Sequence, residues 1–117
     1  MTTKLDVRVG RETAYTVVTL VGELDVISAD GLRAALGKLL LEERVRLVVD
    51  ATELTFCDSM GLRMLLEYAD RATRAGGYMR LAGVRGVFRR ILTVTGLHAA
   101  FPLYDTVAEA VAADAPN

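Results

Sequence analysis

Hydrophobic and polar residues alternate at the start of the chain, where every second residue of 4–9 is apolar and its neighbours are charged. This period of two predicts a half-buried β-strand. Residues 15–21 are apolar or β-branched almost throughout, which predicts a second and more central strand. With a turn at 11–13 and Gly22 closing the second strand, the chain is expected to open with a β-hairpin.

Apolar residues at helical spacing predict two long helices. The first begins after Ser28, a candidate N-cap, and closes at 42–44. The second begins at Asp58-Ser59 and ends at the glycine pair 76–77, which is typical of a helix C-terminus. Its expected core-facing stripe consists of Leu62, Leu65, Leu66, Ala69 and Ala72.

The remaining segments are shorter. Residues 45–49 form an apolar run typical of a strand buried on both faces, and 50–57 are expected to connect it to the second helix. The elements expected after that helix are a strand at 78–82, a short helix around 87–92 ended by Gly96, a strand at 101–103, and a last helix over 107–111 capped by Asp105 or Thr106. Residues 112–117 are expected to fray.

The predicted order of elements is β-β-α-β-α-β-α-β-α. Alternating β and α units after a hairpin predict an α/β fold with a small mixed, mostly parallel sheet. The chain has 117 residues and no internal repeat or linker, so we interpret it as a single domain, 1–117, with its core over 4–111. A chain of this length can bury a hydrophobic core without metal ions or disulfides.

Composition limits the classes of function. The 52% apolar fraction indicates a packed globule, yet no apolar run approaches the roughly 20 residues that a membrane helix needs, and the first residues lack the apolar segment of a signal peptide. The 14 basic and 15 acidic residues nearly cancel, and Arg85, Arg89 and Arg90 are interpreted as a solvated helix face, so nucleic acid is not an expected partner. The single cysteine suits a reducing cytoplasm.

Catalytic, metal and cofactor sites are not expected. One histidine, His98, and one cysteine, Cys57, are too few ligands for zinc, and both common glycine-rich phosphate motifs are missing. Cys57 stands where the G-x-S-x-G nucleophile elbow needs its first glycine, and the only candidate base, His98, falls in a predicted loop. We therefore interpret the protein as a non-enzyme. Cys57 is interpreted as a small packed hydrophobe, with redox sensing as the alternative.

Candidate chemistry gathers at the start of the second helix, in residues 56–62. The first turn of a helix offers unpaired N–H groups and a partial positive charge, so a phosphate on Ser59 would lie where anions are favoured. Gly61 is expected to leave room for a partner's backbone or for the phosphate itself. The alternative is that Asp58 or Ser59 is only an N-cap, since both residue types are common caps.

Three motifs in order resemble the bacterial STAS domains that act as anti-sigma factor antagonists. Residues 58–62 resemble the family's phosphorylation motif, Asp-Ser-Ser/Thr-Gly-Leu after an apolar pair. Residues 22–25 resemble its Gly-Glu-Leu/Ile-Asp loop, and 95–97, which precede Phe101-Pro102, resemble its Thr-Gly-Leu ending. The resemblance covers residues 5–111, and it implies a small sheet with helices packed mainly on one face.

The resemblance also implies a function. Ser59 matches the family's phosphoacceptor, and Asp25 and Asp58 match acidic positions that flank it. The implied partner is an anti-sigma factor that is also a serine kinase: the unphosphorylated antagonist binds it and so frees a sigma factor. A serine phosphatase restores the unphosphorylated form.

We hypothesise that the loop after the second strand and the first turns of the second helix form one binding face. Its residues are Glu23, Leu24, Asp25, Asp58, Ser59, Met60, Gly61, Leu62 and Arg63. Leu62 also fits the core. Met60 and Arg63 depart from the family pattern, which has a small hydroxyl residue and often glycine there, and Arg85-Gly86 stand where a proline-containing helix start is common. The alternative function is therefore a constitutive STAS scaffold in a signalling or transport assembly, without phosphorylation.

Overall fold

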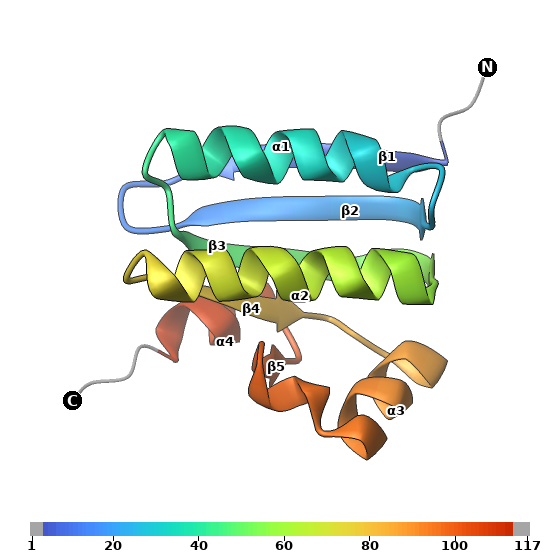
Figure 1. Cartoon of the computed structure of the whole chain (residues 1–117). Coiled ribbons are helices and arrows are strands. Elements are labelled where there is room, and N and C mark those ends of the chain that lie inside the picture. The colour runs from blue at the N-terminus through green and yellow to red at the C-terminus, as the bar shows by residue number, and fades with distance from the viewer. Residues whose placement is uncertain (1–3, 114–117) are drawn as a thin grey trace.

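The five strands of the chain form one sheet in which the spatial order repeats the sequence order. The computed structural model describes residues 4–113. The strands are β1 (Leu5–Arg11), β2 (Thr16–Leu24), β3 (Arg46–Cys57), β4 (Tyr78–Ala82) and β5 (Leu103–Tyr104). The first pair is antiparallel, and every later neighbour is parallel (Figure 1). The helices are α1 (Ala29–Leu41), α2 (Ser59–Arg74), α3 (Gly86–Thr95) and α4 (Val107–Ala112), with a 3₁₀ turn at Leu97–Ala99. This is the predicted α/β fold and element order, with the short 3₁₀ turn added.

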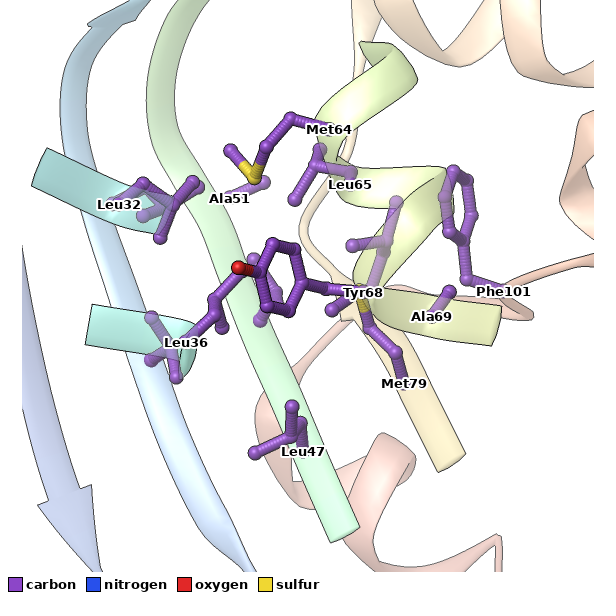
Figure 2. Packing of buried hydrophobic residues seen from close by; sticks show 14 of the residues in the cluster. Leu32, Leu36, Leu47, Ala51, Met64, Leu65, Tyr68, Ala69, Met79 and Phe101 are labelled. Carbon is purple, nitrogen blue, oxygen red and sulfur yellow. The ribbon is translucent and has the colours of Figure 1, made fainter. Parts of the chain in front are cut away.

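The main core lies between the sheet and the two long helices, which run side by side across one face (Figure 1). Leu32 and Leu36 of α1 point toward the α2 side chains Met64 and Tyr68, while Leu47 of β3 lies beneath them (Figure 2). Residues spaced by four positions fall on the same side of a helix, which is why each helix presents one continuous apolar stripe. Burial of these stripes fixes both helices to the sheet.

Of the described helices, α4 is the one that packs on the opposite face of the sheet. Val48 of β3 and Ala82 of β4 point away from the main core and pack against Ala110. Arg80 is buried on this face, where its Nη1 donates to the Ala110 carbonyl oxygen at 2.9 Å and its guanidinium lies 3.7 Å from the centroid of the Tyr78 ring. Helices thus pack mainly on one face, as predicted, and α4 is the exception.

Two strands are longer than their sequence patterns indicated. Gly22 to Leu24 continue β2, and 50–57, predicted as a connection, continue β3. The two extensions pair with each other through irregular register between 19 and 23. Several residues of 52–56 are exposed, so this segment lacks the alternation that reveals a strand.

Smaller differences concern helix faces and caps. Met64 and Tyr68 belong to the buried face of α2, while Leu62 and Leu66 are only half-buried. Thr106, not Asp105, caps α4, since its hydroxyl accepts from the Glu109 N–H at 3.1 Å. The last strand was predicted at 101–103 but occupies Leu103–Tyr104, so the prediction was wrong for 101 and 102. The last helix ends one residue later than predicted, at 112, and of the segment expected to fray, 114–117 lie outside the described residues.

Gly22 is required by a close approach between β1 and β2. Its φ is +119°, and an added Cβ would lie 2.1 Å from the Lys4 carbonyl oxygen. The Glu23 N–H donates to that same oxygen at 2.8 Å, which holds the start of β1 against the end of β2. The first residue of the predicted Gly-Glu-Leu-Asp motif is therefore a structural requirement.

Candidate functional site

The two predicted motifs at 22–25 and 58–62 meet at one end of the sheet. Leu24 ends β2 beside Cys57, which ends β3, and the Asp58 N–H donates to the Leu24 carbonyl oxygen at 3.1 Å. Because both strands are parallel, α1 and α2 also begin at this end. Residues far apart in the chain therefore form one surface (Figure 1).

Asp58 connects the two motifs through its carboxylate. It is the N-cap of α2, and its Oδ1 accepts from the Gly61 N–H at 2.8 Å. Its Oδ2 accepts from the N–H of Val26, in the loop before α1, at 3.3 Å. Both oxygens of Asp58 thus hold backbone groups, so the alternative N-cap interpretation is correct for this residue.

Asp25 organises the loop before α1. Its side chain is almost fully buried, and its Oδ1 accepts from the N–H groups of Ile27 and Ser28 at 3.0 Å each. Its Oδ2 pairs with the Lys4 ammonium at the start of the chain. Lys4 is the largest cause, ahead of the backbone N–H groups, that lowers the pKa of Asp25 to about 2.

Ser28 does not cap α1 in the way its position suggested. Its hydroxyl accepts from the Asp25 N–H at 2.9 Å and donates to the Glu23 carbonyl oxygen at 2.8 Å. Within the described residues, the Ser28 side chain makes no capping hydrogen bond to α1 and instead closes the loop on itself. The side chains of Asp25, Ser28 and Asp58 therefore hold the loop through hydrogen bonds to its backbone.

Acid is expected to weaken the loop through Asp25. A carboxyl whose pKa is lowered on folding stabilises the native state above its unfolded pKa, near 4, and that contribution disappears as the pH falls through the folded pKa, about 2. We expect Asp25→Asn to be less stable than the wild type at pH 6, with the difference shrinking between pH about 4 and about 2. Urea unfolding followed by circular dichroism at each pH measures this difference.

Asp30→Asn provides the matched control, since it removes an exposed carboxylate from the first turn of α1. It should cost no more than about 1 kcal/mol, the contribution of a first-turn carboxylate, and so much less than Asp25→Asn. An Asp25→Asn protein whose deficit persists unchanged to pH 2 would contradict the assignment of the Lys4 pair as the stabilising interaction.

Ser59 is the first residue of α2, and its side chain is exposed. Within residues 4–113 its hydroxyl takes part in no hydrogen bond. The N–H of Gly61 in this first turn is bound by Asp58 and not by Ser59. The hydroxyl is therefore open to solvent at the positive end of a helix. Modification of this oxygen would break no interaction of the described fold.

Two residues predicted to contact a partner lie in the core. Leu24 is fully buried, and a Cβ on Gly61 would lie 2.7 Å from the Leu24 Cγ. Gly61 thus makes room for Leu24, not for a phosphate or a partner's backbone. Asp25 is also buried and acts through the loop it holds, while Leu62 is half-buried and packs against the core.

The accessible residues form what we call the Ser59 surface. Its members are Glu23, Val26, Ile27, Phe56, Ser59, Met60 and Arg63. Sequence reasoning missed three of these: Val26, Ile27, which is 75% exposed, and Phe56, which is 50% exposed. Val26 and Ile27 could have been found from the sequence, because they form an apolar pair in a predicted loop, directly after Asp25 and before the helix. These apolar side chains give the surface the character of a protein contact.

Cys57 adjoins this surface but is an unreactive thiol. Its burial and, to a smaller extent, the neighbouring carboxylate of Asp58 raise its pKa to about 12. The thiolate is the reactive form, so this environment does not favour redox sensing. Over residues 4–113, no group of three acidic, histidine or cysteine side chains is arranged to hold a metal ion, and no helix is long and apolar enough to cross a membrane.

Comparisons with known proteins match most of the chain. A sequence profile of the STAS domain matches residues 5–110. The anti-sigma-F factor antagonist RsfB of Mycobacterium tuberculosis H37Rv is 29% identical over 108 residues, covering 92% of this chain and 87% of RsfB. The crystal structure of an anti-sigma factor antagonist from Mycobacterium paratuberculosis superimposes with a TM-score of 0.84 at 28% identity, over 93% of this chain and 92% of that one. SpoIIAA from Bacillus in its phosphorylated form has the same fold, with a TM-score of 0.74 at 21% identity over 92% and 98% of the two chains.

Proposed function

The chain belongs to the STAS domain family, and from this membership we propose that it is an anti-sigma factor antagonist switched by phosphorylation of Ser59. Support for the class comes from RsfB, which is named as an antagonist of anti-sigma-F factor and aligns with 92% of this chain. The observation that carries the switch is the exposed Ser59 hydroxyl, which is free of hydrogen bonds within residues 4–113.

In the proposed cycle, the unphosphorylated protein binds an anti-sigma factor that is also a serine kinase, and a sigma factor is released. The kinase transfers phosphate to Ser59, and the complex dissociates. A serine phosphatase removes the phosphate and restores binding. The Ser59 surface is the contact in this scheme, with the exposed side chains of Ile27 and Met60 supplying apolar area.

Phosphate on Ser59 would add about −1.5 to −2 charges to the centre of this contact. Asp58, the preceding residue, already carries a carboxylate, and the positive end of α2 offsets the added charge by only about 0.3–1 kcal/mol. Docking an apolar partner surface over the phosphate would remove it from water, which costs several kcal/mol when the charge has no partner. Phosphorylation should not change the stability of the fold, since the Ser59 hydroxyl makes no hydrogen bond within the described residues.

Substitution of Ser59 tests this proposal. We expect Ser59→Asp to weaken binding to the cognate kinase at least about tenfold, and Ser59→Ala to bind like the unmodified protein. Both variants should keep an unfolding free energy within about 0.5 kcal/mol of the wild type, as is usual for surface positions. Isothermal titration calorimetry measures the affinities, and mass spectrometry after incubation with kinase and ATP should find one phosphate, on Ser59.

Thr13→Asp is the matched control, because Thr13 is an exposed hydroxyl residue in the β1–β2 turn, away from the β2 and β3 ends that carry Ser59. It adds the same charge and should leave affinity unchanged. Phosphate on another residue, or a Ser59→Asp variant that unfolds, would show that Ser59 is not the switch. A Ser59→Asp protein that binds as tightly as wild type would favour the constitutive scaffold function instead.

A further inference from the structure

A groove lies between the second half of β3 and α3. It adjoins the Ser59 surface and shares Phe56 with it, but Ser59, Met60 and Arg63 of α2 do not line it. Its cavity volume is about 390 Å³. The residues that carry the argument are Leu54, Phe56 and Cys57 on the strand side and Arg85, Val87 and Ile91 on the helix side. Apart from Arg85, these side chains are apolar or neutral.

The strand wall of this groove is an open β-sheet edge. β4 pairs with β3 only from Arg46 to Asp50, and β5 pairs only with β4. Among the strands of residues 4–113, residues 51–57 of β3 therefore have a neighbour on the β2 side alone (Figure 1). No backbone-to-backbone hydrogen bond joins 53–57 to α3 in the described part of the chain. An open edge offers N–H and C=O groups that a further strand can pair with.

The helix wall presents apolar side chains that the domain itself leaves uncovered. Val87, Ile91 and Val94 occupy positions i, i+4 and i+7 of α3, and Val87 is 75% exposed. The opposite face of α3 buries Leu92 in the core, so this outward stripe is additional to the one that holds the helix in place. Together with Phe56, the stripe makes the mouth of the groove apolar.

The one charged side chain that lines the groove, among the described residues, is the cationic Arg85. Two acids lie outside this lining: Glu53 on β3, and Asp105, whose carboxylate is 3.8 Å from the Arg89 guanidinium. Arg85 donates to the Thr52 carbonyl oxygen at 3.2 Å, a bond that places the guanidinium beside β3 without neutralising it. The adjoining Asp58 directs both carboxylate oxygens at backbone N–H groups. The groove therefore complements a segment that carries a carboxylate.

We propose that this groove binds an extended segment of a partner protein, which adds to the open edge of β3 as a further strand. Main-chain hydrogen bonds to 53–57 hold the segment, its alternate apolar side chains enter the cavity, and a carboxylate meets Arg85. The groove is concave and one wall is a strand edge, which suits a peptide better than a flat bilayer. This binding goes beyond the phosphorylation switch and needs no anti-sigma factor.

Selection from a random peptide library tests the proposal without knowledge of the partner. The full chain is immobilised and screened against displayed peptides of about nine residues, long enough for one strand. Enriched peptides should alternate apolar residues and contain aspartate or glutamate. The N–H groups of an extended peptide face its two edges in alternation, and only one edge pairs with β3. N-methylation of every second residue should therefore abolish binding when it blocks the edge that faces β3, and should leave binding intact when it blocks the other edge. No enrichment, or binding that survives N-methylation of both edges, would overturn strand addition.

Variants locate the binding on the chain. Val87→Asp and Arg85→Glu should each weaken the selected peptide at least about tenfold in fluorescence anisotropy, while Ser59→Asp should not. Leu41→Asp is the matched control, since Leu41 is 87% exposed at the end of α1 and does not line the groove. The alternate amide protons of 53–57 that face away from β2 should gain exchange protection with peptide bound. Equal affinity for Val87→Asp and wild type would overturn the proposal, as would anionic vesicles or a second copy of the chain occupying the groove in place of peptide.

Discussion

Replacing Gly22 with alanine is expected to destabilise the protein by about 3–5 kcal/mol, much of the total stability of a domain this size. Two costs add. Alanine rarely adopts the φ of +119° found at this position, and its Cβ would lie 2.1 Å from the Lys4 carbonyl oxygen, a backbone atom that cannot rotate away. The start of β1 would have to separate from β2. Denaturant unfolding monitored by circular dichroism measures the loss.

Gly10→Ala is the control for this substitution. Gly10 lies in the same pair of strands, but an added Cβ meets nothing within 4 Å and its φ is not positive. We expect a change below about 1 kcal/mol there. Equal losses at both positions would mean that the contact with Lys4 is not the reason for the glycine, since the effect of alanine on the unfolded chain alone is stabilising.

The second large effect is expected where α2 packs against the end of β2. Leu24→Ala should cost about 2–5 kcal/mol, because it empties a fully buried site. Gly61→Ala should cost about 1–3 kcal/mol, although alanine is the better helix former, since the new Cβ would lie 2.7 Å from the Leu24 Cγ. In the double variant the shortened side chain removes that clash, so its loss should fall short of the sum by about 1 kcal/mol or more.

Gly31→Ala tests helix propensity without a clash. Gly31 lies in the first turns of α1, and an added Cβ there meets nothing within 4 Å. This variant should be as stable as wild type or up to about 1 kcal/mol more stable. If Leu24→Ala and Gly61→Ala proved additive in urea unfolding, the close contact between the two motifs would not be the reason for the glycine.

The sequence pattern predicted the bounds of an element correctly where a buried apolar segment is flanked by residues, such as glycine, that end helices and strands. The strand at 78–82 is an apolar segment between Gly77 and Gly83, and its bounds match the structure. The extension of β3 over 50–57 was missed because its register is irregular and one edge has no partner strand, so exposed and half-buried residues follow no simple period. Propensity alone does not identify such a strand.

The sequence predicted those site residues whose role depends only on their neighbours in the chain. Asp58 as a helix cap and an accessible Ser59 follow from their place before an apolar stripe. Leu24 and Gly61 as a contact pair depend on how α2 crosses the end of β2, which no local pattern contains. The exposure of Ile27 likewise depends on the tertiary arrangement, since an apolar residue beside a helix start is as often part of a core.

The tie between Lys4 and Asp25 bears on how binding should be measured. It places the first described residue of the chain beside the loop that borders Ser59, whereas α4, near the other terminus, packs over β3 and β4 on the far face of the sheet. A fluorophore, affinity tag or sensor-chip linkage attached ahead of Lys4 would emerge next to the proposed Ser59 contact and is expected to obstruct it. Attachment after α4 leaves that end of the molecule free.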